Sequence, residues 1–465
     1  MSEPFTLRWK IDRPYIEAGK TEDVFVLATI EPNSAVLGSG STSLPVHILL
    51  LVDVSASMDF LVRFDPNAQN LGEGLTEGRQ AQQVISEVPS RREMACTVVE
   101  RLAQRLQPTD MLTIVAYDDM GYLLAEGIAP NDTAAVADAL KKLGKVGGGG
   151  SNLSHGVDVV RLVMSRLNDG PRTRKLVLLT DGEDDDPDSA LADARKLSSE
   201  FNLPIVAFGT GECKVSFLTE VAKTTLAGAF NDIRHETEAE QFFHQVLTGQ
   251  KNVQATNVAL KLWLSPDLQV RELYRTRPEI LFVGDLAPDE QNLVTLRLEQ
   301  MERGKAYEFL FRCTLPLRGA GQRLRLAKAS LSYDLPGQGK RDLIQEANIV
   351  VTYTAAPDQA RERSGDVLRV LNRAEVQRQV LFLQSKIDAL KRGDNNPRDA
   401  VIVANMLKAL IAKFEQFGDQ VMINLYRSMQ DEFTKSGAIS QSMLNRSLAA
   451  SSRADEMIVA QDIDF

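Results

Sequence analysis

The sequence is poor in cysteine and histidine: its 465 residues include three of the first and four of the second. Cys96, Cys213 and Cys313 lie far apart and form no Cys-x-x-Cys pair, so neither a disulfide framework nor a cysteine zinc site is predicted. The histidines show no ligand spacing such as His-x-x-x-His. The few, widely separated cysteines favour a reducing compartment.

The sequence also lacks long apolar runs and an excess of basic residues. No run reaches the roughly 18 residues that a membrane helix needs, and the segment from Met1 to Lys10 does not have the pattern of a signal peptide. The net charge is -10, whereas nucleic-acid binding by counterion release needs a basic face. We therefore expect a soluble, cytoplasmic protein without a membrane span or a nucleic-acid partner.

Hydrophobic periodicity divides the chain into parts, since 465 residues are too many for one ordinary domain. Residues 5–31 have the alternation of strands, in which Phe5, Leu7 and Trp9 are separated by polar residues. Residues 33–45 have the glycine, serine and proline content of a linker. We interpret residues 1–45 as N-terminal strands and a linker.

Residues 46–250 contain apolar runs of strand length that alternate with segments of helical period. A continuous apolar strand indicates burial on both faces of a parallel sheet. The runs lie at 46–52, 111–117, 175–180 and 204–208, and the helical segments lie near 91–106, 132–143, 153–167, 187–200, 215–226 and 236–248. This alternation predicts a doubly wound α/β domain.

Residues 251–356 return to a period of two with turn residues between the runs, which predicts an antiparallel β-sandwich. A hairpin alone is marginal in water, so we expect residues 1–32 to complete this sandwich, with the α/β domain inserted between its parts. The alternative is a separate N-terminal hairpin packed on the α/β domain. Residues 357–434 predict a helical segment of four amphipathic stretches, and residues 435–465 a weakly ordered tail.

The first apolar strand of the α/β domain ends in the pentapeptide Asp53-Val54-Ser55-Ala56-Ser57. In an open parallel sheet, ligands collect at the carboxyl ends of the strands. A carboxylate and two hydroxyls at alternate positions of a tight turn can converge on one point, and hard oxygen ligands suit Mg²⁺. The pattern alone is weak evidence, because it arises by chance in many proteins.

Two further features follow it in the chain. Residues 147–150 are four glycines that form a flexible loop before the hydroxyl of Ser151, and a helical segment comes next. Thr180-Asp181-Gly182 then ends another buried strand with an acid and a glycine. Each feature lies in a strand-to-helix connection or at a strand end, so all three fit one face of the domain.

These motifs, in this order on an alternating α/β frame, resemble the von Willebrand factor A family over residues 46–250. The resemblance implies a metal-ion-dependent adhesion site (MIDAS) that binds Mg²⁺ or Mn²⁺ and is completed by an Asp or Glu carboxylate of a protein partner. Residue by residue, it implies the metal ligands Asp53, Ser55, Ser57, Ser151 and Asp181. Ser151 stands where the family usually has threonine, so the hydroxyl is kept but the methyl that restricts χ1 is lost.

The sequence departs from the family between the motif and the first helix, where residues 59–90 intervene. This insertion is rich in Gly, Gln, Glu and Asn, and it carries Phe60, Leu61, Val62 and Phe64 near the site. Its position requires it to emerge on the metal face. We hypothesise that it shapes or covers the partner surface, and a disordered loop is the alternative.

Two catalytic or nucleotide-binding interpretations are disfavoured by single positions. The glycine loop is followed by Ser151-Asn152, whereas a phosphate-binding loop needs lysine and a hydroxyl residue after its glycines. An aspartyl phosphatase needs a second acid two residues after its nucleophile, and Ser55 stands there after Asp53. Neither activity is predicted.

Two acidic segments have a structural and a functional interpretation. The acids at 183–188 favour the N-terminus of the next helix as a solvated loop, and a second cation such as Ca²⁺ is the alternative. The segment 452–465 is interpreted as a disordered tail. Its alternative is a carboxylate that docks into the metal site of the same or a neighbouring molecule, which would give self-association.

We predict a metal-dependent protein-binding scaffold and not an enzyme. The architecture also resembles multidomain bacterial von Willebrand A proteins and the inter-alpha-trypsin-inhibitor heavy-chain type, analogies that fix no partner. The alternatives are an adaptor that recruits substrate to a MoxR-type AAA+ ATPase, an Mg²⁺-dependent hydrolase and a DNA-end binder of the Ku type. The acidic balance of the chain opposes the last.

Overall fold

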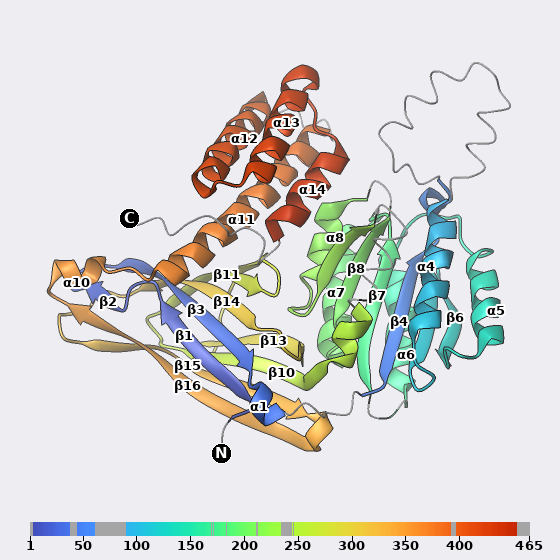
Figure 1. Cartoon of the computed structure of the whole chain (residues 1–465), viewed down its shortest axis with the longest axis horizontal. Coiled ribbons are helices and arrows are strands. Elements are labelled where there is room, and N and C mark those ends of the chain that lie inside the picture. Colours follow the sequence, from blue (N-terminus) through green and yellow to red (C-terminus); the bar gives the residue numbers. More distant parts are fainter. Residues whose placement is uncertain are drawn as a thin grey trace.

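The computed structural model consists of a β-sandwich, an α/β domain and a helical bundle (Figure 1). It describes residues 3–37, 44–60, 90–168, 170, 172–182, 184–210, 213–233, 244, 246–391 and 397–452. In Figure 1 the sandwich lies to the left, the α/β domain to the right and the bundle above them. Across these described ranges, no helix has the length and apolarity that crossing a membrane would require.

The α/β domain is built on a six-stranded sheet. Its order is β6 (Gly121–Ile128), β5 (Met111–Tyr117), β4 (Val46–Asp53), β7 (Thr173–Thr180), β8 (Ile205–Thr210) and β9 (Ala229–Ile233). All neighbours pair in parallel except β6, which follows β5 through a short turn and pairs with it antiparallel. The apolar runs predict the four central strands, whereas the edge strands β6 and β9 are additions that the structure makes.

The central strand β4 is fully buried because helices cover both faces of the sheet. The helices are α4 (Arg91–Arg105), α5 (Thr133–Leu143), α6 (Leu153–Arg166), α7 (Pro187–Phe201) and α8 (Val215–Ala222). Leu49 and Leu51 pack with α6, α7 and α8, while Ile48 and Leu50 pack with α4 and α5 on the other face. The predicted doubly wound arrangement is confirmed. Most of the helix predicted at 236–248 lies outside the described residues.

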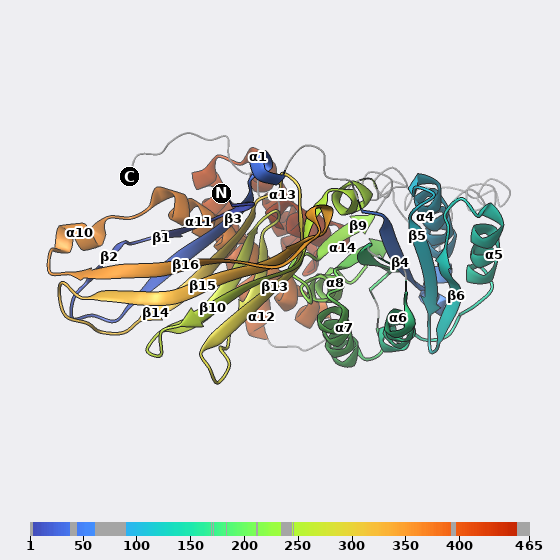
Figure 2. The ribbon, with the colours of Figure 1, turned by 90° about the horizontal axis from the view of Figure 1, so that it is seen from below.

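The sandwich consists of two five-stranded sheets that lie face to face (Figure 2). One has the order β1 (Phe5–Ile11), β3 (Glu22–Pro32), β14 (Tyr307–Leu315), β11 (Gln269–Arg277) and β12 (Leu281–Asp285). The other has the order β13 (Leu293–Glu302), β10 (Val253–Leu264), β15 (Arg323–Leu335), β16 (Lys340–Thr354) and β2 (Tyr15–Glu17). Because β3 pairs with β14 and β2 with β16, the N-terminal strands complete the sandwich and a separate hairpin is wrong.

The C-terminal part is a helical bundle that differs from the prediction in two ways. Its helices are α11 (Gly365–Lys391), α12 (Pro397–Phe417), α13 (Gln420–Ser436) and α14 (Gln441–Ser452), whereas the short helix α10 (Pro357–Arg361) lies against β2 and β16 of the sandwich. The first two predicted stretches are the single helix α11. Residues 441–452, predicted as weakly ordered, form α14, whose Leu444 and Leu448 are buried in the bundle core. The tail beyond Ser452 lies outside the described residues.

Helix α11 connects the three parts. Its first half packs against the outer face of the sandwich, where Val367 and Leu371 share a core with Tyr274 of β11. Its second half joins the core of the α/β domain, in which Val380 and Leu218 of α8 belong to one apolar cluster. The bundle is therefore fixed beside α8 and not tethered by a free linker.

The junction between the sandwich and the α/β domain is polar and buried. Arg275 of β11 donates through Nη1 to the backbone oxygens of Leu226 (2.6 Å) and Gly228 (2.9 Å), between α8 and β9. Glu299 of β13 accepts a hydrogen bond from the backbone of Ala227 in the same turn. Burial raises the pKa of Glu299 to about 8, and its Oε2 has no hydrogen-bond partner among the described residues.

The raised pKa of Glu299 predicts a pH-dependent stability. The folded state keeps the Glu299 carboxyl neutral up to about pH 8, whereas the unfolded chain ionises it above the ordinary pKa of 4.5. The contribution of Glu299 to stability is therefore complete below pH 4.5 and is lost as the pH rises to about 8. Because one pKa unit corresponds to about 1.4 kcal/mol, we expect Glu299→Gln to raise the free energy of unfolding by a few kcal/mol at about pH 9 and by little at about pH 5. Urea denaturation at both pH values measures this. The exposed Glu290→Gln serves as the control, and an equal change in both variants at high pH would contradict the prediction.

Candidate metal-binding site

Three segments meet at the carboxyl edge of the parallel sheet. Strand β4 lies between β5 and β7, so its last residue, Asp53, occupies the middle of this edge. Thr180 and Asp181 follow from β7, and the glycine loop before α6 brings Ser151 to the same place. The segments are far apart in sequence, yet the topology of the sheet makes them neighbours.

The Asp53 carboxylate is the centre of this arrangement. It is fully buried, and the surrounding segments supply hydrogen-bond donors to it. They are the backbone N of Ser55 to Oδ1 (2.8 Å) and, to Oδ2, Thr180 Oγ1 (2.6 Å), Ser151 Oγ (3.2 Å) and Tyr117 OH (3.4 Å). Strand β4 thus ends in a carboxylate that faces hydroxyl groups from both neighbouring strands and from the glycine loop.

The serines of the first motif lie in a short turn after β4. Ser55 precedes the 3-10 helix η1 (Ala56–Asp59), and its Oγ lies 3.1 Å from Ser57 Oγ. The turn is joined to the glycine loop by backbone hydrogen bonds, one from Ala56 N to Gly149 O and one from Gly148 N to Val54 O. The turn therefore holds the predicted ligand Ser55 beside Asp53, and it holds Ser57 beside Ser55.

Gly147 explains why the loop needs glycine. Its φ is +91°, a backbone conformation that other residues rarely adopt. A Cβ atom at this position would lie 2.2 Å from the backbone oxygen of Val54. The close approach of the glycine loop to the end of β4 therefore excludes any side chain here.

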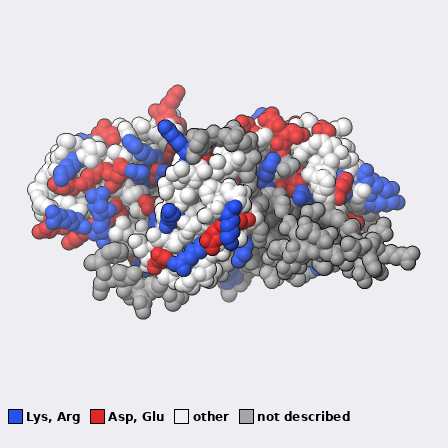
Figure 3. Space-filling view, turned by 90° about the horizontal axis from the view of Figure 1, so that it is seen from above, with Lys and Arg blue, Asp and Glu red and all other residues white. Residues whose placement is uncertain are grey.

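Acidic side chains hold the glycine loop from outside. Their acceptor contacts are Asp118 Oδ2 with Gly149 N (3.1 Å), Asp119 Oδ2 with Gly150 N (2.9 Å), Asp185 Oδ2 with Ser151 N (3.0 Å) and Asp184 Oδ2 with Leu153 N (2.8 Å). Of the predicted acidic segment, Asp186 caps the next helix, α7, as expected. Asp184 and Asp185 reach across to the start of α6 instead. Figure 3 shows acidic side chains gathered on the α/β domain beside the helical bundle.

The electrostatics of the site indicate a place for a cation. Burial raises the pKa of Asp53 to about 6, hydrogen bonds from Ser55 and Thr180 oppose this, and the nearby charge of Asp181 adds to it. Asp181 is itself fully buried. Two buried carboxylates side by side repel one another unless a positive charge lies between them.

The available donor atoms fit a hard divalent ion. Within the described ranges, no group of three or more His, Cys, Asp or Glu side chains is arranged so that it could hold a metal ion, which disfavours a zinc site of nitrogen and sulfur ligands there. The donors at this edge are instead carboxylate and hydroxyl oxygens from Asp53, Ser55, Ser57, Ser151 and Asp181. Mg²⁺ and Mn²⁺ prefer such oxygens.

Three residues contact the predicted ligands without being among them. Thr180 and Tyr117 donate to Asp53, and Arg91 donates to Asp181 through Nη1 at 2.7 Å. The hydroxyl of Thr180 belongs to the Thr-Asp-Gly pattern, which is the one signal that could have identified it. Arg91 is the first residue of α4 and directly follows the inserted residues 59–90. Residues 61–89 lie outside the described residues, so the hypothesis that they cover the partner surface stays a prediction.

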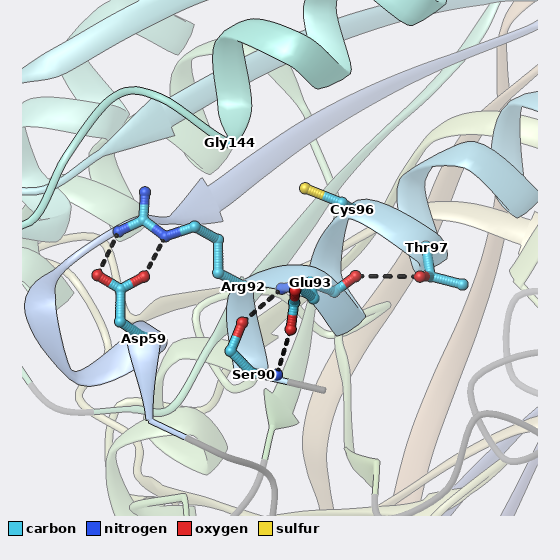
Figure 4. Close-up of a pocket in the computed structure, with 7 residues that line it drawn as sticks. All are labelled: Asp59, Ser90, Arg92, Glu93, Cys96, Thr97 and Gly144. Atoms are coloured by element: carbon cyan, nitrogen blue, oxygen red, sulfur yellow. Dashed lines mark hydrogen bonds and ion pairs between the residues drawn. The ribbon is translucent and has the colours of Figure 1, made fainter. Parts of the chain in front are cut away.

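A cleft of about 570 Å³ lies beside the first turn of α4 (Figure 4). It is lined by Asp59, Ser90, Arg92, Glu93, Cys96, Thr97 and Gly144. In Figure 4 the guanidinium of Arg92 faces the carboxylate of Asp59, with Nε to Oδ1 at 2.6 Å. Arg92 also donates to the backbone oxygens of Val54 and Val146, so it joins α4 to the metal motif and to the start of the glycine loop.

Comparison with known proteins assigns this region to a family. Residues 48–183 match the family model of the von Willebrand factor type A domain, and this range includes all five candidate ligands. An uncharacterized protein of Synechocystis sp. is 25% identical over 253 residues, which are 53% of this chain and 58% of that relative. The chain thus matches less than two thirds of the relative's length.

Two solved structures share the fold over nearly the whole chain. The von Willebrand factor type A protein from Catenulispora acidiphila aligns with a TM-score of 0.71 and 16% identity over 97% of this chain and 96% of that one. The ArnB paralog VWA2 from Sulfolobus acidocaldarius aligns with a TM-score of 0.56 and 14% identity over 97% and 99%. This chain therefore contains a von Willebrand factor type A domain, held in a three-part fold that both of these structures share.

Proposed function

We propose that the chain is a protein-binding scaffold that holds Mg²⁺ or Mn²⁺ at the carboxyl edge of its parallel sheet. The observation that carries this proposal is the convergence of two buried carboxylates, Asp53 and Asp181, with the hydroxyl of Ser151. Ser55 and Ser57 supply two more hydroxyls from the adjoining turn. A bound divalent ion would supply the positive charge that attracts a carboxylate of the partner.

Binding is favoured over catalysis by the residues around Asp53. A nucleophilic carboxylate in a phosphatase needs an acid nearby to protonate the leaving group, and Ser55 occupies the relevant position. The nearby acids Asp118, Asp119, Asp184 and Asp185 accept backbone N–H groups of the glycine loop. Their carboxylates maintain the shape of the loop, which is a structural role.

The exposed surroundings of the site suit contact with another protein. Phe60, just after η1, is 64% exposed, and Met120, in the turn between β5 and β6, is 61% exposed. Both follow segments that end at the carboxyl edge of the sheet. Aromatic residues and methionine are enriched at protein interfaces.

The first prediction concerns metal binding itself. In Mn²⁺ titration by calorimetry, Asp53→Asn should weaken binding by at least the roughly 100-fold that changes to outer-shell partners of a metal site cost. In EDTA the same variant should melt no lower than the unmodified protein, because it removes the repulsion between Asp53 and Asp181. Asp138→Asn, an exposed acid on α5, is the matched control. Equal Mn²⁺ affinity in all three proteins would contradict the proposed site.

The second prediction concerns the partner. A pull-down from the source cell extract should recover a partner in Mg²⁺ that is lost in EDTA and lost with Asp53→Ala or Asp181→Ala. The Asp138→Ala variant should retain it, since that carboxylate lies on an exposed face of α5. If the same proteins are recovered under every condition, binding does not depend on the metal site.

A further inference from the structure

A cationic side chain of this chain already contacts the candidate metal site. The guanidinium of Arg91 donates from Nη1 to Asp181 Oδ2 at 2.7 Å. The Asp181 side chain is fully buried, and the Arg91 side chain is only 15% exposed. The pair therefore lies largely away from water, where opposite charges interact more strongly than at a surface.

Arg91 is held in place by the start of α4. Its backbone N donates to Phe60 O at 3.0 Å, and Ser90 caps the helix through a reciprocal pair of contacts with Glu93. The next residue, Arg92, is tied to Asp59 and to the backbone of Val54. The first turn of α4 is thus attached to the metal motif on one side and presents Arg91 to Asp181 on the other.

The ion pair and a metal ion make competing demands on Asp181. A buried carboxylate that loses a positive partner is strongly destabilised, so Arg91 offsets part of the cost of burying Asp181 when no metal is bound. A divalent ion would balance the charges of Asp53 and Asp181 without help. With the guanidinium still against Asp181, the loaded site would instead carry an excess of positive charge.

We propose that Arg91 is a built-in counter-cation that competes with the divalent ion for Asp181 and so lowers the affinity of the site for metal. This inference rests on the proposed function. Metal binding releases Arg91 from Asp181, and because Arg91 belongs to the first turn of α4, metal occupancy is coupled to the position of that turn. Coupling of this kind is reciprocal, so whatever holds Arg91 on Asp181 disfavours the metal.

Calorimetric titration with Mn²⁺ tests the competition directly. Arg91→Gln should bind Mn²⁺ about tenfold more tightly than the unmodified protein, a change within the usual range of coupling between sites. Arg195→Gln, which removes one exposed guanidinium from α7, is the matched control and should leave the affinity unchanged. Arg91→Lys keeps the charge, so its affinity for Mn²⁺ should lie between those of Arg91→Gln and Arg195→Gln.

Thermal melting supplies a readout that does not depend on the titration. In EDTA, Arg91→Gln should melt below the unmodified protein, and saturating Mn²⁺ should raise its melting temperature by more than it raises that of the unmodified protein. In EDTA, the double variant Arg91→Gln with Asp181→Asn should lose less melting temperature than the single variant Arg91→Gln. The gain in Mn²⁺ affinity should disappear, because the shared carboxylate is gone.

The outcomes separate this inference from the function on which it rests. If Arg91→Gln binds Mn²⁺ no more tightly than the unmodified protein, Arg91 does not compete for Asp181, while the metal site stands. If no variant and no unmodified protein binds Mn²⁺, both the competition and the proposed function fail. Tighter binding in Arg195→Gln of equal size would reduce the effect to overall charge and would also overturn the inference.

Discussion

The buried carboxylate of Asp53 is the constraint on which the site depends. It ends a strand whose side chains are covered on both faces, so it has little access to water and needs donors from its neighbours. Thr180, Ser151 and Tyr117 supply them. Each donor belongs to a different segment, so a single charged group is hydrogen-bonded to the ends of β5 and β7 and to the residue after the glycine loop.

The rest of the chain holds this edge in place from a distance. The sandwich is closed by strands from both sides of the α/β domain, which fixes the entry and exit of that domain. At the junction, Arg275 and Glu299 satisfy backbone groups of one turn, so the contact is directional and not only apolar. Helix α11 then joins the bundle to the sandwich and to α8.

Much of this can be predicted from the sequence, because apolar runs and motifs are local patterns. The four central strands follow from such patterns, and the candidate ligands around Asp53 follow from the motifs together with the family that they resemble. The roles of Tyr117 and Arg91 do not, since they depend on strand order and on contacts between segments that are far apart in the sequence. Helix α14 is short of apolar residues, and its order comes from packing of Leu444 and Leu448.

The contacts around the site also bear on what metal binding can achieve. The glycine loop is held by Asp118, Asp119, Asp184 and Asp185 and by backbone hydrogen bonds to the Asp53 motif, so its shape does not depend on a cation. A site whose ligands are organised in advance spends little of the binding free energy on ordering its own loops. Most of the electrostatic attraction of a bound ion would then remain for the partner's carboxylate. The competing charge of Arg91 is the exception within this preorganised frame, because it opposes metal binding at Asp181.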